Sequence, residues 1–172
     1  AGVIRMLDHL EGDGHALLDF CRANHLEGLV AKRRQSRYES GPRRGGDWVK
    51  VKCERDEDFV VVGLARGEGN RKELGALDLA TYEDGRLVHR GKVGSGLDDK
   101  TIALLLQKLP PLALPEKQAE GEYMPAPTGR LHIKPEVVVS VRFLGWSDGG
   151  HARFPVFRGI REDMSPRECT AG

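Results

Sequence analysis

Short apolar runs separated by charged and glycine-rich segments make up most of the chain. Within residues 26–52, two runs rich in Val and Leu flank a basic segment, a pattern typical of two strands joined by a surface loop. Before them, Leu17, Phe20 and Cys21 recur at helical spacing after Asp13, a residue type that caps helix N-termini. We therefore expect a helix that packs this apolar face beneath the strands.

Downstream of residue 58 the pattern is mainly β. Apolar runs predict five strands, at residues 59–65, 75–82, 86–93, 135–144 and 151–160. A helix capped by Asp98 is expected after the third strand, and the proline-containing segment 112–129 is typical of a long loop. Five strands with a helix after the third match an OB-fold, a barrel that commonly binds oligonucleotides. The fold class predicted for the chain is therefore mainly β with α (α+β).

Composition limits the classes of function. Hydrophobic residues make up 39% and charged residues 31% of 172 residues, which is typical of a globular protein with a modest core. No apolar run approaches the roughly 20 residues that span a bilayer, so we expect a cytoplasmic protein with no membrane partner. The formal net charge is only +1, so a nucleic-acid role depends on where basic residues cluster. Neither the three cysteines nor the six histidines have the spacing of a structural zinc site.

Two lysines in the second strand of the N-terminal pair define a candidate anion site. Side chains alternate across a strand, so Lys50 and Lys52 point to the same side. Two ammonium groups this close repel each other unless an anion lies between them, and phosphate is the usual anion. Glu27, which opens the first strand, is a carboxylate that can bring a divalent cation to the same phosphate.

Four segments carry a resemblance to a known family. Residues 27–32 (Glu-Gly-Leu-Val-Ala-Lys) and 48–52 (Trp-Val-Lys-Val-Lys) resemble nucleotidyltransferase motifs IV and V of the ATP-dependent DNA ligases. Residues 8–14 (Asp-His-Leu-Glu-Gly-Asp-Gly) and 159–163 (Gly-Ile-Arg-Glu-Asp) resemble the ligase module of the bacterial end-joining (LigD-type) polyproteins. The matches occur in the family's order and cover nearly the whole chain.

The resemblance implies a reaction in three steps. A lysine takes AMP from ATP, the AMP passes to the 5′-phosphate at a DNA break, and the 3′-hydroxyl displaces it to seal the strand. Glu27 then matches the carboxylate near Mg²⁺ or Mn²⁺, and Lys50 and Lys52 match the lysines that hold the nucleotide's phosphate. Arg161 and Asp163 match the start of motif VI, which folds over ATP and orients the departing pyrophosphate. The implied location is the bacterial cytoplasm, at the nucleoid when the protein is on DNA.

The resemblance also implies a domain division and a missing part. Residues 1–54 are expected to be the last segment of a nucleotidyltransferase (adenylation) domain, and residues 55–172 a five-stranded OB-fold domain with one helix. The charged run 53–58 is expected to be a hinge or solvated connection. The nucleophile motif Lys-x-Asp-Gly is absent, so we expect the N-terminal half of the domain in cis or in another chain. Met164 stands where motif VI usually ends in lysine.

The segment between the two N-terminal strands is the most basic in the chain. Five arginines lie within residues 33–47, and we expect them to contact the backbone of nicked or broken duplex DNA: Arg33, Arg34, Arg37, Arg43 and Arg44. A solvated loop without a specific role is the alternative. A bacterial end-joining protein that binds DNA ends is a further possible partner implied by the resemblance.

Several interpretations remain open from the sequence. The leading one is the C-terminal portion of an ATP-dependent DNA ligase, inactive without its nucleophilic lysine. A non-catalytic OB-type nucleic-acid-binding module or a subunit of a split ligase is the second, and an RNA ligase or capping-type nucleotidyltransferase is the third. Lysines of an edge strand that merely face water would also explain Lys50 and Lys52.

Overall fold

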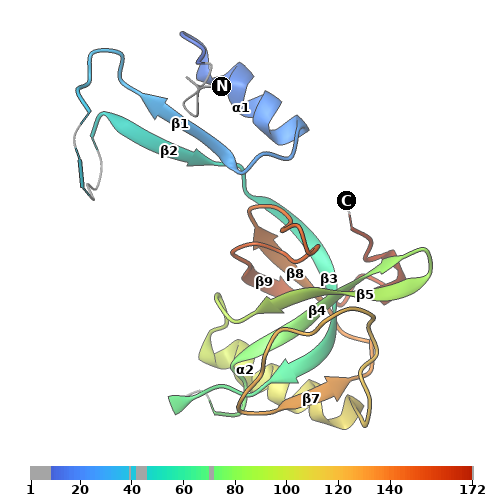
Figure 1. Ribbon diagram of the computed structural model, residues 1–172. Helices are drawn as coiled ribbons and strands as arrows, with labels where there is room; N and C mark the ends of the chain where they lie inside the picture. Colours follow the sequence, from blue (N-terminus) through green and yellow to red (C-terminus); the bar gives the residue numbers. More distant parts are fainter. Residues whose placement is uncertain (1–8, 39, 42–45, 70–71, 172) are drawn as a thin grey trace, which may run out of the picture. The chain divides into compact units, whose positions relative to one another are not determined.

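The computed structural model describes residues 9–38, 40–41, 46–69 and 72–171 (Figure 1). The chain divides into two compact units, Ala1–Glu54 and Arg55–Gly172, and each has its own sheet. Among the described residues, the helices are too short or too polar to cross a membrane. The two units are called the N-terminal and C-terminal unit below, and each is described by itself.

The N-terminal unit consists of a helix and an antiparallel hairpin. Its elements are α1 (Gly14–Ala23), β1 (Gly28–Lys32) and β2 (Trp48–Lys52). The side chain of Asp13 caps α1 by accepting a hydrogen bond from the His15 amide at 2.9 Å. Cys21 is buried and lies 3.9 Å from the carbonyl oxygen of Gly28, but Phe20 is 57% exposed. The prediction that Phe20 packs beneath the strands is therefore wrong, because the described hairpin covers only the Cys21 side of α1.

The C-terminal unit contains seven strands and one α-helix within the described residues. In chain order these are β3 (Arg55–Ala65), β4 (Ala76–Glu83), β5 (Arg86–Val93), α2 (Asp99–Lys108), β6 (Ala113–Leu114), β7 (Arg130–Ile133), β8 (Val138–Phe143) and β9 (Val156–Ile160), with short 3-10 helices at Pro110–Leu112 and Pro166–Glu168. The strands β3, β4 and β5 form an antiparallel meander, β8 pairs with β3, and β9 pairs with β8. A parallel bridge between Ser95 and Val156 joins the end of β5 to β9. A meander, a helix, two further strands and this closing bridge are the OB-fold predicted from the sequence.

The sequence prediction missed two strands, β6 and β7, and it placed the start of β3 four residues too late and the start of β9 five residues too early. The charged run at residues 55–58 is not a connection, because β3 begins at Arg55 and pairs in register with β8 from Phe143 to Val138. Its acidic side chains are compatible with a strand because β8 and the segment after β9 supply arginine partners. The segment 112–129 is not wholly a loop, since Ala113–Leu114 pairs with β7. A two-residue strand is too short to produce a periodic signal.

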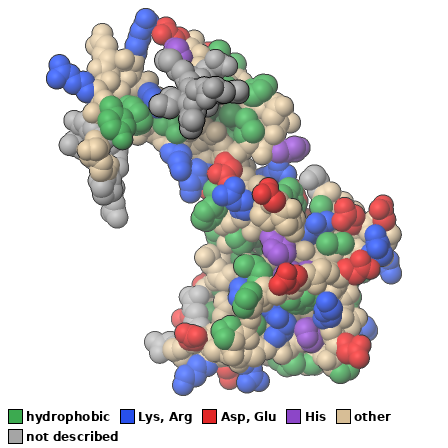
Figure 2. All heavy atoms as spheres, viewed as in Figure 1, with side chains coloured by type: hydrophobic (Ala, Val, Ile, Leu, Met, Phe, Trp, Pro, Cys, Tyr) green, Lys and Arg blue, Asp and Glu red, His purple; other side chains and the backbone are tan. Residues whose placement is uncertain are grey.

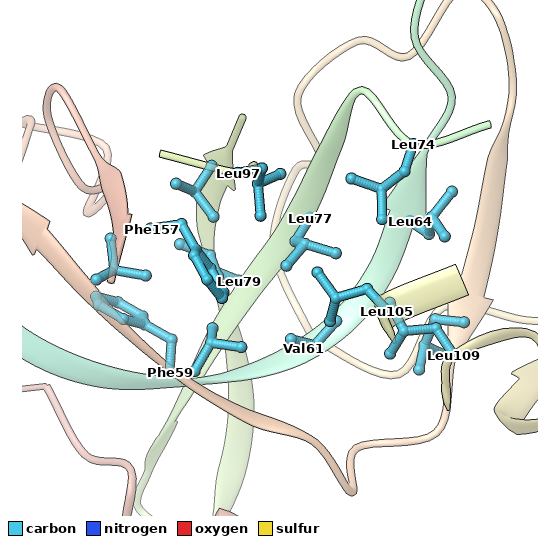
Figure 3. Packing of buried hydrophobic residues seen from close by; sticks show 14 of the residues in the cluster. Phe59, Val61, Leu64, Leu74, Leu77, Leu79, Leu97, Leu105, Leu109 and Phe157 are labelled. Carbon is cyan, nitrogen blue, oxygen red and sulfur yellow. The ribbon is translucent and has the colours of Figure 1, made fainter. Parts of the chain in front are cut away.

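The core lies on both faces of β3. Phe59 and Val61 contribute to a larger cluster, whereas Val60 and Val62 contribute to a second cluster that also contains Cys169. Figure 3 shows the larger cluster, in which Leu105 of α2 and Leu109, the C-cap of that helix, lie beside Val61 of β3. A strand that is buried on both faces is apolar at every position, which explains the continuous apolar run that begins at Phe59.

Candidate functional site

The hairpin of the N-terminal unit places its lysines on one face. In the β1–β2 register, Lys50 is opposite Val30, Lys52 is opposite Gly28 and Lys32 is opposite Trp48. Directly opposed residues of an antiparallel pair share a face, and alternate residues of a strand share it too. Lys32, Lys50 and Lys52 are therefore on the same side of the hairpin, and all three are exposed. We call this side the lysine face.

The sequence pattern did not single out Lys32 as a site residue. Its ammonium lies 4.2 Å from the centroid of the Trp48 ring, a cation–π contact that fixes the far end of the lysine face. The cross-strand register that brings Lys32 to Trp48 depends on how the two strands pair. Alternation within one strand revealed Lys50 and Lys52, but it carries no information about the partner strand.

Glu27 lies at the other end of the hairpin, directly before β1. Its carbonyl oxygen accepts a hydrogen bond from the Cys53 amide at 2.8 Å, so the pairing of the two chain segments extends beyond Gly28 and Lys52. Gly28 is required here because its φ is 142° and a Cβ atom would lie 2.1 Å from the Val51 carbonyl oxygen. This glycine therefore brings the Glu27 backbone close to the end of β2 that carries Lys52.

Glu27 is the carboxylate on this hairpin that the sequence predicted as a cation ligand. Within the described ranges, no group of three or more His, Cys, Asp and Glu side chains is arranged to hold a metal ion. Glu27 is exposed, and Mg²⁺ in phosphate-transfer sites is typically held by one or two carboxylates together with substrate phosphates. The donor set fits a metal ion that arrives with a nucleotide better than it fits a resident metal.

The basic loop between β1 and β2 is partly neutralised by local acids. Arg33 pairs with Asp47 at 2.8 Å and Arg34 with Glu11 at 2.9 Å, and Arg37 is exposed. Both pairs are exposed, and such pairs contribute little to stability, so a phosphate group can replace the carboxylate at small cost. Arg43 and Arg44 lie outside the described residues.

Aromatic side chains accompany these arginines. Tyr38 is 77% exposed and its ring packs edge-on against Trp48, with 5.7 Å between ring centroids. The indole N–H of Trp48 donates to the Ser36 hydroxyl at 2.9 Å. The loop therefore joins the lysine face through an aromatic pair whose outer ring is open to solvent.

Arg161 and Asp163 lie in the C-terminal unit, directly after β9. The guanidinium of Arg161 donates two hydrogen bonds to Asp163, both at 2.9 Å, and a third to Asp58 of β3 at 2.9 Å. The hydrogen bond from Arg161 lowers the pKa of Asp163 to about 2, and the two carboxylates raise the pKa of Arg161. The structure thus joins the two predicted residues to a third, Asp58, which the sequence pattern placed in a connection.

Met164 does not face the solvent side of the Arg161 cluster as a lysine would. Its side chain is half-buried and packs against the second hydrophobic cluster, whose members include Val60 and Cys169. Arg167, the next basic residue, lies over the ring of Tyr82 at 4.8 Å. Motif VI therefore ends in a packing contact in this chain.

A hollow of about 600 Å³ opens on the C-terminal unit and was not predicted. It is lined by Arg66, Lys92 and Ser95, together with small residues of β3, β4 and β5 and the start of β9. Phe154 lies at its edge, 67% exposed, with φ at 53° in the left-handed region. A phenylalanine there costs conformational energy and exposes an apolar ring, and such strained residues cluster at ligand sites. The sequence gives no signal for it, because φ cannot be read from residue type.

A buried polar network lies inside the C-terminal unit. Asp78 is fully buried and accepts two hydrogen bonds from Arg130, at 2.8 and 3.1 Å, and lies 3.4 Å from the Nε2 atom of His89. Tyr123 stacks on His89 with 4.2 Å between ring centroids. Gly63 makes room for the carboxylate, since a Cβ atom would lie 2.5 Å from it. Asp78 and His89 are buried and Arg130 is half-buried, so we assign this network to stability.

The fold and these residues define a class, and comparison with known proteins agrees with it. Residues 70–164 match the sequence family described as ATP dependent DNA ligase C terminal region. The barrel of the C-terminal unit is thus the C-terminal region of a ligase, and the Arg161 cluster lies at its end.

Individual relatives narrow the class. The multifunctional non-homologous end joining protein LigD of Pseudomonas aeruginosa is 37% identical over 84% of the chain and 18% of its own length, and the DNA ligase of Thermococcus fumicolans is 39% identical over 83% and 25%. The crystal structure of the ligase domain of Mycobacterium tuberculosis LigD superposes with a TM-score of 0.66 at 34% identity, covering 95% of this chain and 53% of that one. A mycobacterial DNA ligase D complexed with ATP and MES gives a TM-score of 0.60 at 34% identity, covering 95% of this chain and 52% of that one.

The chain belongs to the family of ATP-dependent DNA ligases, as a C-terminal portion of the LigD type. It spans 18–25% of the length of these curated relatives and about half of the solved ligase domain.

Proposed function

We propose that the protein containing this chain seals breaks with a 5′-phosphate and a 3′-hydroxyl in duplex DNA, through enzyme–AMP and DNA–adenylate intermediates. ATP is the AMP donor, and the nucleophilic lysine lies outside this chain. The observation that carries the proposal is the lysine face, on which Lys50 and Lys52 lie together in a chain of the ligase family. The solved mycobacterial relative in complex with ATP supports the choice of nucleotide.

Each candidate residue has a role in this proposal. Lys50 and Lys52 hold the nucleotide's phosphate and neutralise charge that develops during AMP transfer. Glu27 would hold Mg²⁺ or Mn²⁺, which when bound supplies further charge neutralisation at the phosphate. Arg161 binds and orients the departing pyrophosphate, and Asp163 holds the Arg161 guanidinium before the nucleotide binds.

DNA binding is assigned to two surfaces of different character. The basic loop, with Arg33, Arg34 and Arg37 and the undescribed Arg43 and Arg44, contacts phosphates through charge. The hollow beside Phe154 contributes an exposed ring and the cations of Arg66 and Lys92. The remaining partners proposed are the N-terminal half of the adenylation domain, in cis or as another chain, and a bacterial end-joining protein that binds DNA ends.

Replacing Lys52 tests the proposal in the natural protein that contains this chain. We expect Lys52→Ala to lower the rate of nick sealing about 100-fold or more, since a charge that faces the phosphate is removed. Thermal unfolding should be unchanged because the side chain is exposed. The matched control is Lys100→Ala, an exposed lysine of α2, which should seal at the wild-type rate. Equal sealing by both variants contradicts the assignment.

The packing of Met164 favours a second candidate, a nucleic-acid-binding module without catalysis. Without a lysine at this position, motif VI has one fewer cation for the pyrophosphate. This candidate predicts that the natural protein binds nicked duplex yet forms no covalent AMP adduct with ATP and a divalent metal. Detection of the adduct by intact mass eliminates it.

A further inference from the structure

The three hydrogen bonds of Arg161 go to two carboxylates that differ in how firmly they are held. Asp58 lies in β3, opposite Ser140 of β8, within a continuous antiparallel register from Arg55 to Val60. Its side chain is 17% exposed, whereas the side chain of Asp163 is 70% exposed in the turn after β9. Asp58 is therefore the fixed partner of the guanidinium, and Asp163 is the exchangeable one.

The charge of this cluster does not suit an anionic ligand as it stands. One guanidinium between two carboxylates carries a net charge of −1, which repels a triphosphate or pyrophosphate. A phosphate oxygen can be accepted only if one carboxylate leaves the guanidinium. If Asp163 leaves the guanidinium, water can replace its lost hydrogen bonds because its side chain is exposed. Water can do this much less well for the half-buried Asp58.

We propose that Asp58 is a positioning residue for Arg161, holding Nη1 from β3 while a phosphate oxygen of the nucleotide replaces Asp163 at Nε and Nη2. This inference rests on the function proposed above. An arginine side chain loses rotamer entropy when it is fixed in one orientation. Because Asp58 already holds Nη1, the guanidinium of Arg161 meets the phosphate in a defined orientation. Such orientation of the reacting groups raises the reaction rate.

The test compares two steps of the reaction in the natural protein that contains this chain. One assay measures transfer of AMP from labelled ATP to the protein, with the KM for ATP. The other measures sealing of a nick whose 5′-phosphate is already adenylylated, without ATP. We expect Asp58→Asn to slow AMP transfer about 10-fold at saturating ATP without raising the KM for ATP, because the variant loses the orientation of Arg161 but also one negative charge. It should seal the adenylylated nick at the wild-type rate. Asp58→Ser, which shortens the side chain, should give the same separation.

Asp56→Asn is the matched control. Asp56 lies two residues earlier on β3, on the same face, and accepts two hydrogen bonds from Arg142 at 2.9 and 3.0 Å. Its replacement removes an ion pair of the same kind between β3 and β8, so it reports the structural cost alone. We expect wild-type rates in both assays for this variant.

The outcomes are distinguishable. Wild-type AMP transfer by both Asp58 variants overturns the positioning role, as does an equal decrease in both assays or an equal decrease with Asp56→Asn. A wild-type protein that forms no AMP adduct and seals no adenylylated nick overturns the proposed function instead, and this inference with it.

Discussion

The two units differ in how completely they bury their own apolar residues. Within the described residues, the C-terminal unit buries two clusters that include Phe59, Leu105 and Phe143, all at 1% exposure or less. The N-terminal unit buries Cys21 and Cys53 alone among its described hydrophobic residues. Its exposed large hydrophobic residues are Leu10, Phe20, Leu26, Val30, Tyr38, Trp48 and Val49. Figure 2 shows hydrophobic side chains on the viewed surface of this unit.

This difference in burial is consistent with the comparisons, in which the chain covers only about half of the solved ligase domain. A unit with a complete core is stable by itself, whereas an exposed apolar surface of this size is typical of a surface that another element covers. The N-terminal half of the adenylation domain, proposed above as a partner, would cover these exposed residues. The following predictions test this contrast between a self-sufficient barrel and an incomplete hairpin.

The largest effect is expected from a pair of phenylalanines. Phe59→Ala should lower the free energy of unfolding by about 3–5 kcal/mol because it opens a cavity in the larger cluster. Phe20→Ala should change it by less than about 0.5 kcal/mol because the ring is already exposed. Urea unfolding of this chain measures both. A decrease of several kcal/mol for Phe20→Ala contradicts the contrast.

The buried network of the barrel gives the next effect. Asp78→Asn leaves the Arg130 guanidinium without its carboxylate and should cost about 3 kcal/mol. Burial raises the pKa of Asp78, but hydrogen bonds from His89 and Arg130 outweigh it and leave the pKa below its ordinary value. The unfolded chain then takes up the proton first, so this contribution is present above about pH 4 and is lost as pH falls through the folded pKa.

The pH dependence of folding stability distinguishes the contribution of Asp78 from the effect of protonating exposed carboxylates. Stability measured from pH 6 downward should fall less steeply below about pH 4 for Asp78→Asn than for the wild type. The control is Asp148→Asn, an exposed carboxylate between β8 and β9, whose curve should keep the wild-type slope. Parallel curves for wild type and Asp78→Asn refute the role given to the network.

The basic loop tests the contribution of the N-terminal unit to DNA binding. Replacing Arg33, Arg34 and Arg37 by Ala should weaken binding of nicked duplex and reduce the slope of log affinity against log salt by about 0.9 for each phosphate that these arginines neutralise. Arg86→Ala, at an exposed ion pair with Glu120 in the C-terminal unit, is the control. An unchanged slope of log affinity against log salt would mean that the basic loop is solvated and does not contact DNA phosphates.

The smallest effect on DNA binding is expected from Phe154. Unlike the arginine variants, a Phe154 variant should weaken binding without changing its salt dependence. Phe154→Ala should weaken binding of nicked duplex about 10-fold by removing an exposed ring. Because no charge is removed, the salt slope should stay at the wild-type value. A change in slope without a change in affinity at low salt would contradict the division into a charged and an aromatic surface.

The hydrophobic pattern and the family motifs predicted more of the OB-fold barrel than of the candidate site. The five strands follow from apolar runs, and the closure follows from the OB-fold they imply. The strands β6 and β7 and the strand start at Arg55 were missed, because pairing with distant partners decides all three. The same holds for the site: Lys50 and Lys52 follow from alternation, but Lys32 depends on register and Asp58 on a contact across 103 residues. The positive φ angle of Phe154 could not be predicted, because a phenylalanine in the sequence does not indicate a left-handed backbone.

Hydrogen exchange measured on this chain and on the natural protein that contains it tests the central contrast most directly. We predict that amides of β1 and β2 exchange quickly in this chain alone and become protected in the natural protein, whereas amides of β3 and β4 are equally protected in both. Strong protection of β1 and β2 in this chain alone would contradict the account, because the hairpin would then be stable without a covering element.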